Sequence, residues 1–369
     1  MAILKTVVTV GSALIDTIAL IDSDRIERMS MNNADRAYLL IEEGKKTEAA
    51  LISTHVGGGA INAAVSFARQ GFAASAIAKL GRDGRAGTIR SVLLAEGVSC
   101  DYLRETDEAA TGASILISSH GKNAAIFTFR GANILFEPID LPAAAFHADI
   151  VYVSSLSDRS ADLFPAIIAH ASAAHAFIVT NPGIRQLSAR GDAVEQALSN
   201  IALLSMNKEE AAALVPRLMS RHPKPARKIF PPHAAGDMPL MHRGLSSNGF
   251  DMAFAHFLEA VLNLGPRCVV VTDGRNGAYA ATQSAIVFCP AVAADVVGTA
   301  GAGDAFTSTF AAKFAAGATP GEALRYATVN AASVVTFADT QTGLLCSSVL
   351  EQRHAVTTAQ MSLTVWTFE

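Results

Sequence analysis

The sequence predicts an α/β protein with a mainly parallel central sheet, and three observations lead to that prediction. Short runs rich in β-branched residues recur along most of the chain. Amphipathic stretches of helical length lie between these runs, as in chains that wind strand, helix, strand. Two regions break the alternation with strands joined directly by turns, which predicts a small second sheet. We therefore expect three layers, αβα, with the small sheet as a lid over a site.

The expected elements follow from these patterns. Strands are predicted at 6–10, 74–80, 150–154, 177–180, 201–205 and 268–272. Helices are predicted between them at 62–70, 84–94 and 162–173. The lid is expected from about 13–55 and 100–131, with a hairpin in 112–129 that turns at 120–123.

One domain is expected to span residues 1–345, with a surface insertion at 216–249. That stretch is dense in proline and basic residues and lacks periodicity, and prolines at such density disfavour helices and sheet ladders. The basic residues could instead bind phosphate, but a solvated loop is the favoured interpretation. Residues 346–369 receive no assigned role.

Composition limits the kind of partner. Charged residues make up 17% of the chain, hydrophobic residues 50%, and the net charge is −4. This balance is typical of a globular enzyme and predicts a small solute as partner, with no nucleic acid and no membrane. Asp16 interrupts the apolar N-terminus and no cleavage site follows, so a cytoplasmic location is expected. The four scattered cysteines show no metal-binding spacing and are expected to be reduced.

The strongest chemical signal is the run VGTAGAGDAFTSTF at 297–310. Gly301, Ala302 and Gly303 precede a helix, where free backbone N–H groups and the helix dipole favour an anion. Asp304 would repel that anion unless its carboxylate accepts a proton from an attacking hydroxyl while the N–H groups hold a phosphoryl group. The alternative is that Asp304 only caps the helix.

A second glycine turn precedes another predicted helix. Gly57 and Gly58 allow close approach of the backbone, and Asn62 can direct its amide to a polar ligand or cap the helix. Asp16 follows the first strand, where its carboxylate could bridge two vicinal hydroxyls or simply complete a turn.

The two segments that contain the glycine turns, 57–63 and 298–304, resemble the signatures of the ribokinase-like carbohydrate kinases, also called the phosphofructokinase-B family. The first is GG-x-x-x-N-A, here 57–63, and the second is D-T-x-G-A-G-D, here 298–304. Shorter matches occur in order at 81–83, 207–210, 272–277 and 330–332. The resemblance spans about 7–335 and implies a ribokinase-like fold with ATP and Mg²⁺ as cofactors.

The resemblance also implies roles for single residues. Asp304 would be the general base, and Gly301, Ala302 and Gly303 the anion hole. The acceptor would be bound by Asp16, Gly57, Gly58 and Asn62, with Arg130 reaching it from the lid. The nucleotide would be bound by Asn207, Thr272, Gly274, Gly277 and Asn330, with Glu210 holding Mg²⁺ through water. Each of these assignments has an alternative when the residue is taken alone. Glu210 could be an exposed carboxylate on a helix, residues 272–274 could be a turn at the end of a strand, and Arg130 could be a surface residue.

The chain departs from the family pattern at one position. Gly298 stands where members activated by a monovalent cation have an aspartate that helps to bind K⁺. This puts a K⁺ site in doubt, and Asp295 is near in sequence but out of register.

Three functions follow from these residues. A kinase that phosphorylates a sugar, at a primary hydroxyl, is the first, and a nucleoside kinase is the alternative in the same superfamily. A metabolite-binding regulator without catalysis is the third, but it would be expected to lack Asp304 or the anion hole. We also expect a homodimer that pairs through the lid.

Overall fold

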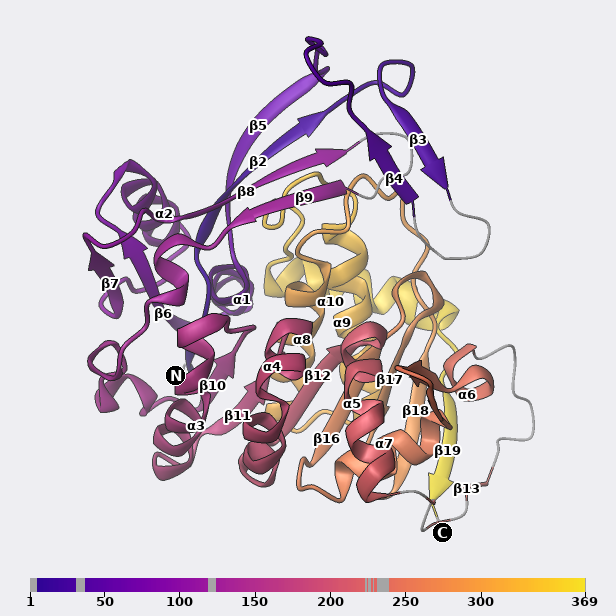
Figure 1. The fold of residues 1–369 in the computed structure, drawn as a ribbon. Helices are drawn as coiled ribbons and strands as arrows, with labels where there is room; N and C mark the ends of the chain where they lie inside the picture. Colours follow the sequence, from indigo (N-terminus) through magenta and orange to yellow (C-terminus); the bar gives the residue numbers. More distant parts are fainter. Residues whose placement is uncertain are drawn as a thin grey trace.

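The computed structural model describes residues 5–30, 37–118, 124–222, 224, 227, 229–230 and 239–368. These residues form a main sheet of eleven strands, shown in Figure 1. In sheet order the strands are β13 (Ile229–Phe230), β19 (Thr364–Phe368), β18 (Ala285–Cys289), β17 (Ala278–Ala281), β16 (Cys268–Thr272), β12 (Leu203–Asn207), β11 (Phe177–Thr180), β10 (Ile150–Val153), β1 (Thr6–Val10), β6 (Ala73–Gly81) and β7 (Leu103–Thr106).

The run of strands from β16 to β7 is parallel, which confirms the mainly parallel sheet. The strands from β17 to β13 extend it with antiparallel pairs. The prediction at 201–205 was shifted, since β12 begins two residues later and ends at Asn207. This places Asn207 at the carboxyl edge of the sheet, where parallel α/β sheets bind ligands.

Helices cover both faces of the sheet, as Figure 1 shows. On one face lie α3 (Phe164–Ala173), α4 (Ile184–Ala197), α5 (Lys208–Arg221) and α7 (Phe254–Leu262). On the other lie α1 (Gly59–Arg69), α2 (Gly84–Ala95), α8 (Ala302–Ala315), α9 (Pro320–Val334) and α10 (Ser347–Thr357). Each layer closes its own apolar core: in β10, Val151 and Val153 enter the first core, and Ile150 and Tyr152 the second. This alternation explains why the central strands read as unbroken apolar runs.

The lid is a four-stranded sheet with the order β5-β2-β8-β9, made of β5 (Leu51–Gly57), β2 (Leu14–Leu20), β8 (Gly112–Ser118) and β9 (Ala124–Phe129). It stands above the main sheet in Figure 1, beside the hairpin of β3 (Glu27–Ser30) and β4 (Ala37–Leu40). The hairpin expected in 112–129 is confirmed by the antiparallel pairing of β8 with β9. Its expected turn, 120–123, lies wholly outside the described residues.

The prediction that 216–249 is a surface insertion formed by a solvated loop is wrong at both ends. α5 continues through Pro216 to Arg221 because Leu214, Val215 and Leu218 bury its inner face, which offsets the cost of the proline. After residues outside the described part, α6 (Pro239–Arg243) and the hairpin of β14 (Leu245–Ser247) and β15 (Phe250–Met252) pack onto the core through Leu240 and Leu245.

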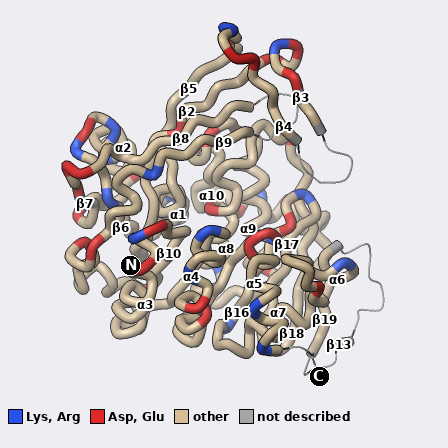
Figure 2. The backbone as a smooth tube through the Cα atoms, viewed as in Figure 1, with Lys and Arg blue, Asp and Glu red and all other residues tan. Residues whose placement is uncertain are grey.

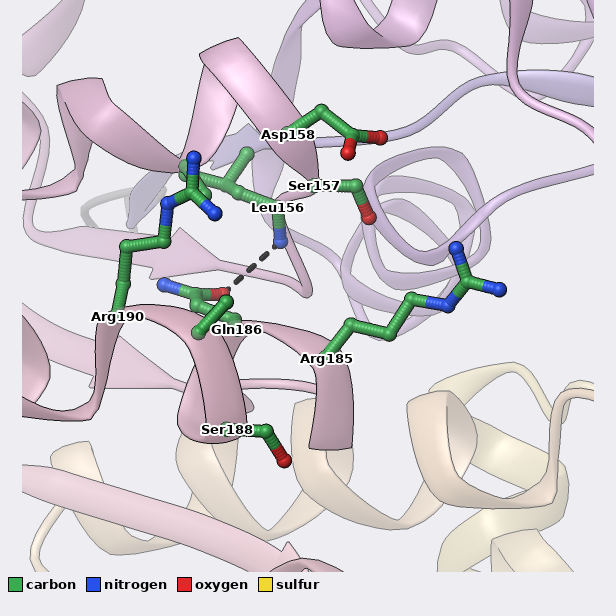
Figure 3. A pocket seen from close by; sticks show the side chains of 9 residues that line it. Leu156, Ser157, Asp158, Arg185, Gln186, Ser188 and Arg190 are labelled. Atoms are coloured by element: carbon green, nitrogen blue, oxygen red, sulfur yellow. Dashed lines mark hydrogen bonds between the residues drawn. The ribbon is translucent and has the colours of Figure 1, made fainter.

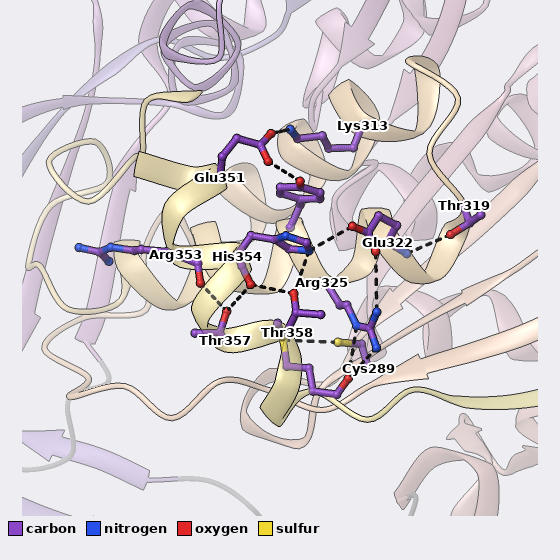
Figure 4. Close-up of polar contacts among 12 residues, drawn as sticks. Cys289, Lys313, Thr319, Glu322, Arg325, Glu351, Arg353, His354, Thr357 and Thr358 are labelled. Carbon is purple, nitrogen blue, oxygen red and sulfur yellow. Dashed lines mark hydrogen bonds and ion pairs between the residues drawn. The ribbon is translucent and has the colours of Figure 1, made fainter. Parts of the chain in front are cut away.

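The C-terminal segment 346–369 also belongs to the main fold. β19 pairs with β18 inside the large sheet, and α10 packs against α9. Figure 4 shows the polar contacts there, among them the one that Glu351 accepts from Lys313. His354 also stacks on Tyr326, with ring centres 3.7 Å apart. Sequence reasoning left this segment unassigned because its helix shows little amphipathic pattern.

Charge is spread over the molecule. In the view of Figure 2, basic and acidic residues are interspersed and form no extended face of one sign. Within the described part of the chain, none of the helices has both the length and the apolar character needed to span a membrane.

Candidate active site

The site is built at the start of α8. Gly301 is the N-cap residue, with φ of 78°, and a Cβ there would meet Thr340 Cβ at 2.7 Å, so the turn requires glycine. A Cβ at Gly303 would meet nothing within 4 Å. Among the described residues, no side chain forms a capping hydrogen bond at this helix end. Ala302 N makes only a long hydrogen bond, to the carbonyl of Thr299 at 3.4 Å, which an incoming anion could replace.

Asp304 lies in the first turn of α8 and connects the two main motifs. Asn62 Nδ2, on α1, donates to Asp304 Oδ2 at 2.9 Å. Asp304 Oδ1 lies 3.4 Å from the point where a Cβ on Gly59 would stand, so the glycine turn before α1 faces the carboxylate directly. The motifs at 57–63 and 298–304 thus meet at a single carboxyl group.

The orientation of Asn62 is fixed from the far side by residues that sequence reasoning missed. Asn62 Oδ1 accepts from Thr340 Oγ1 at 2.9 Å and from Gln341 Nε2 at 3.2 Å. Both lie in the loop after α9, far from Asn62 in sequence, with no local motif to mark them. They leave the amide nitrogen of Asn62 directed at Asp304, which argues against a simple helix cap.

Asp16 lies on β2, on the lid face that is turned to the interior. Its Oδ1 accepts from Ser114 Oγ on the neighbouring strand, and the residue is only 8% exposed. A Cβ on Gly57 would meet Asp16 Oδ2 at 2.1 Å, so Gly57 makes room for this carboxylate. Gly58 has φ of 104° and passes close to the carbonyl of Ser12.

The carboxylates of the site have raised pKa values. Burial raises the pKa of Asp304 to about 6, the hydrogen bond from Asn62 lowers it, and the charge of Asp16 raises it further. Burial likewise raises the pKa of Asp16, against the opposing effects of Ser114 and His55. Asp304 is therefore mostly ionised at neutral pH, yet basic enough to accept a proton.

Glu210 and Asn207 form a reciprocal cap at the start of α5. Asn207 N donates to Glu210 Oε2 and Glu210 N to Asn207 Oδ1, both at 2.8 Å. Burial raises the pKa of Glu210 to about 7, the Asn207 hydrogen bond lowers it, and the charges of Glu209 and Asp304 raise it. Among the described residues no group of three or more His, Cys, Asp or Glu is placed to hold a metal. One desolvated carboxylate fits Mg²⁺, which proteins often bind through one or two carboxylates together with substrate phosphates.

The predicted nucleotide loop follows β16. Gly274 has φ of 53° and Gly277 φ of 106°, conformations that favour glycine, and Thr272 ends the strand. Between them Asp273, which was not predicted, is buried and lies 3.2 Å from Lys208 Nζ at the start of α5. This ion pair joins the nucleotide loop to the helix that carries Glu210.

Asn330 is expected to contact the nucleotide, but in the structure its side chain contacts other parts of the protein. Its side chain is fully buried, donates to Thr309 Oγ1 at 2.7 Å and accepts from Leu345 N at 2.9 Å. It ties α9 to α8 and to the next loop. Contact of its amide with a nucleotide stays a prediction and would require these partners to change.

The two remaining positions are Arg130 and Gly298. Arg130 ends the lid, and its Nη1 donates to Ser157 Oγ at 2.8 Å. A Cβ on Gly298 would meet the carbonyl oxygens of Phe337 and Ala338 at 3.1 and 3.3 Å, so this position faces carbonyls and contributes no charge. Asp295 is exposed.

Comparison with known proteins gives one family. The sequence model of the family described as "pfkB family carbohydrate kinase" matches residues 5–238 and 251–345 of this chain. A ribokinase of Staphylococcus aureus is 26% identical over 264 residues, 70% of this chain and 74% of that protein. A fructokinase of Klebsiella pneumoniae is 25% identical over 276 residues, 72% of this chain and 78% of that protein.

Solved structures share the fold. The Arabidopsis thaliana ribokinase complexed with ribose and ATP superposes with a TM-score of 0.69 at 20% identity, covering 95% of this chain and 99% of that one. A nucleoside kinase of Burkholderia thailandensis in complex with inosine gives 0.68 at 14% identity, covering 95% and 98%.

Proposed function

The chain belongs to the pfkB family of carbohydrate kinases and uses ATP to phosphorylate a sugar or a nucleoside, and we propose that its acceptor is a small sugar. We further propose that the phosphoryl group goes to a primary hydroxyl and that Asp304 is the general base. The observation that carries the mechanism is the hydrogen bond from Asn62 to Asp304 at the open N-terminus of α8.

Each residue of the site has a defined task in this proposal. Asp304 accepts the proton of the attacking hydroxyl as the bond to phosphorus forms. The N–H groups of the turn 301–303 stabilise the charge on the transferring phosphoryl group. Asn62 keeps the carboxylate of Asp304 ionised and oriented, while Asp16 accepts hydrogen bonds from the acceptor hydroxyls.

The nucleotide side is assigned on the same basis. Thr272, Gly274 and Gly277 would bound the nucleotide, with Asn207 and Glu210 nearest to its phosphates. Glu210 would hold Mg²⁺ through water, and that ion would supply compensation for the phosphate charge.

Replacing Asp304 tests the catalytic assignment. Asp304→Asn keeps the shape and the partner Asn62 but removes the base, so kcat should fall by about 10²–10⁴. ATP binding, measured by calorimetry, should persist and serves as the folding control. Near-normal turnover by the folded variant would exclude Asp304 as the base.

The acceptor class is tested by an ADP-release screen with ATP-Mg²⁺ over sugars, sugar acids and nucleosides. Preference for a nucleoside by tenfold or more in kcat/KM, about 1.4 kcal/mol, would replace the sugar kinase with the nucleoside kinase.

We also propose a homodimer that pairs through the lid. Side chains alternate between the two faces of a sheet, and the face opposite Asp16 carries Ile52, Ile115, Phe127 and Phe129, each about half-exposed or more. A contiguous apolar face of this kind is typical of a contact surface. Sedimentation should give a dimer that Phe127→Asp converts to a monomer, and a monomeric parent protein would exclude the pairing.

A further inference from the structure

A cavity of about 350 Å³ lies between the 3₁₀ helix η4 (Asp158–Leu163) and the first turns of α4. Figure 3 shows Ser157, Asp158 and Arg185 directed to one side of it and Arg190 to the other. Gln186 lines the cavity and is only 1% exposed; its Oε1 accepts from Leu156 N at 3.0 Å. Its Nε2 has no hydrogen-bond partner among the described residues, so a buried donor is left unused beside the cavity.

Two arginines meet at this place from different parts of the fold. Arg130 arrives from the lid and binds Ser157, which lines the cavity, and Arg185 lies in the first turn of α4. Burial lowers the pKa of Arg130, the charge of Arg185 lowers it further, and Asp158 has the opposite effect. Within the described part of the chain neither guanidinium forms an ion pair, whereas Arg190 is paired with Asp162 at 3.0 Å.

The backbone holds Arg130 firmly in this position. The next residue, Gly131, has φ of 51°, and a Cβ there would meet the carbonyl of Ala110 at 2.1 Å. Asn133 binds the N–H and the carbonyl of Ala13, both at 2.9 Å, which ties this turn to the segment leading to Asp16. The place of Arg130 is thus set by the fold, and its repulsion with Arg185 would be relieved by an anion bound to both.

The cavity lies within reach of the catalytic carboxylate. Ser154 Cβ lies 2.9 Å, and Asp304 Oδ1 3.4 Å, from the point where a Cβ on Gly59 would stand. Ser157 follows Ser154 by three residues, and an extended chain of that length spans at most about 11 Å. Ser157 therefore lies close enough along the chain for one small acceptor to place its hydroxyl at Asp304 and its other end beside Ser157 and Arg130.

We propose that Arg130, Arg185 and Ser157 bind an anionic group, a carboxylate or a phosphate, at the end of the acceptor remote from the hydroxyl that is phosphorylated. The inference rests on the proposed function and narrows the acceptor to a sugar acid or a sugar phosphate. Guanidinium groups form paired hydrogen bonds with both kinds of oxyanion. The unpaired Nε2 of Gln186 is directed to the Arg190 side of the cavity and is not part of this set.

The test compares matched acceptors in the ADP-release assay: a neutral sugar, the acid with the same hydroxyls, and the corresponding sugar phosphate. The acid and the phosphate arms identify which anion is used. A hydrogen bond to a charged group contributes about 1.5–3 kcal/mol, so Arg130→Gln or Arg185→Gln should lower kcat/KM for the preferred anionic acceptor about ten- to a hundredfold. The loss should be smaller for the neutral sugar, which lacks the anionic group. Arg159→Gln, which removes an exposed arginine on η4, is the matched control and should leave kcat/KM for every acceptor close to that of the parent enzyme.

Equal use of neutral and anionic acceptors, with no selective loss in the arginine variants, would overturn the anion site and leave the kinase assignment intact. If no acceptor releases ADP, the proposed function fails instead. Calorimetric binding of the same acid and phosphate then decides the anion site alone: binding that is lost in both arginine variants supports it, and absence of binding to the parent protein refutes it.

Discussion

Replacing Asn62 by alanine gives a quantitative test of how the site holds its base. The bond from Asn62 Nδ2 to Asp304 Oδ2 favours the ionised carboxylate against burial and the charge of Asp16. A hydrogen bond to a charged group contributes about 1.5–3 kcal/mol. One pKa unit corresponds to 1.36 kcal/mol, so losing this bond should raise the pKa of Asp304 by about one to two units.

The sign of the effect follows from the role that we propose for Asp304. A general base must be ionised, so activity falls as the pH drops through its pKa. In the parent enzyme the acid limb of kcat/KM should lie near the pKa of about 6, and in Asn62→Ala it should move to about 7 or 8. Bound ATP adds negative charge in both enzymes, so the difference between the two profiles is the quantity to compare.

The assay is kcat/KM for the acceptor between pH 5 and 9 (roughly the range that brackets both values) at saturating ATP-Mg²⁺. Thr340→Val is the matched control, because it removes a bond to Asn62 Oδ1 and leaves the bond to Asp304 in place. An acid limb that stays put while activity falls evenly at all pH values would refute the reasoning. Asn62 would then act on the acceptor alone.

Three further predictions concern the metal, the cation and the acceptor turn. Burial raises the pKa of Glu210 to about 7, so Mg²⁺ should bind more tightly as the pH rises through 7. Glu210→Gln should abolish that pH dependence and raise the Mg²⁺ concentration needed for activity about tenfold or more. The same pH dependence in the variant would exclude Glu210 as a group that holds Mg²⁺. At matched ionic strength, K⁺ should change turnover little because Gly298 adds no carboxylate, and activation of about tenfold would contradict this. Gly57→Ala should displace Asp16 and lower kcat/KM for the acceptor by up to about a hundredfold, whereas Gly87→Ala, where a Cβ meets nothing within 4 Å, should be silent; equal activities would refute the fit of Asp16 to Gly57.

The parts of the fold that sequence could predict are those with local patterns. The strands at 6–10, 177–180 and 268–272 were predicted to the residue, because central strands of a parallel sheet are apolar runs bounded by turns. The prediction of a loop around Pro216 was wrong. A proline indicates a helix break from the local sequence alone, whereas the burial of Leu214 and Leu218, which stabilises the helix, depends on the packing of the whole molecule. The C-terminal strand β19 was not predicted at all, because its pairing with β18 joins segments that are far apart in the sequence.

The candidate site shows the same division between local and distant information. The turns before α1 and α8 can be recognised in the sequence by their glycines. Glycine is needed there because, at Gly58 and Gly301, the backbone passes other atoms too closely for a side chain. The residues that orient the site, Thr340, Gln341 and Asp273, carry no such mark, since each acts through a contact with a distant segment. Arg130 lies between these cases: the sequence offers it as a lone arginine, and only its convergence with Arg185 gives it a chemical meaning. The motifs therefore indicate where the proposed reaction takes place, while the groups that we propose to bind the acceptor come from parts of the chain that only the fold brings together.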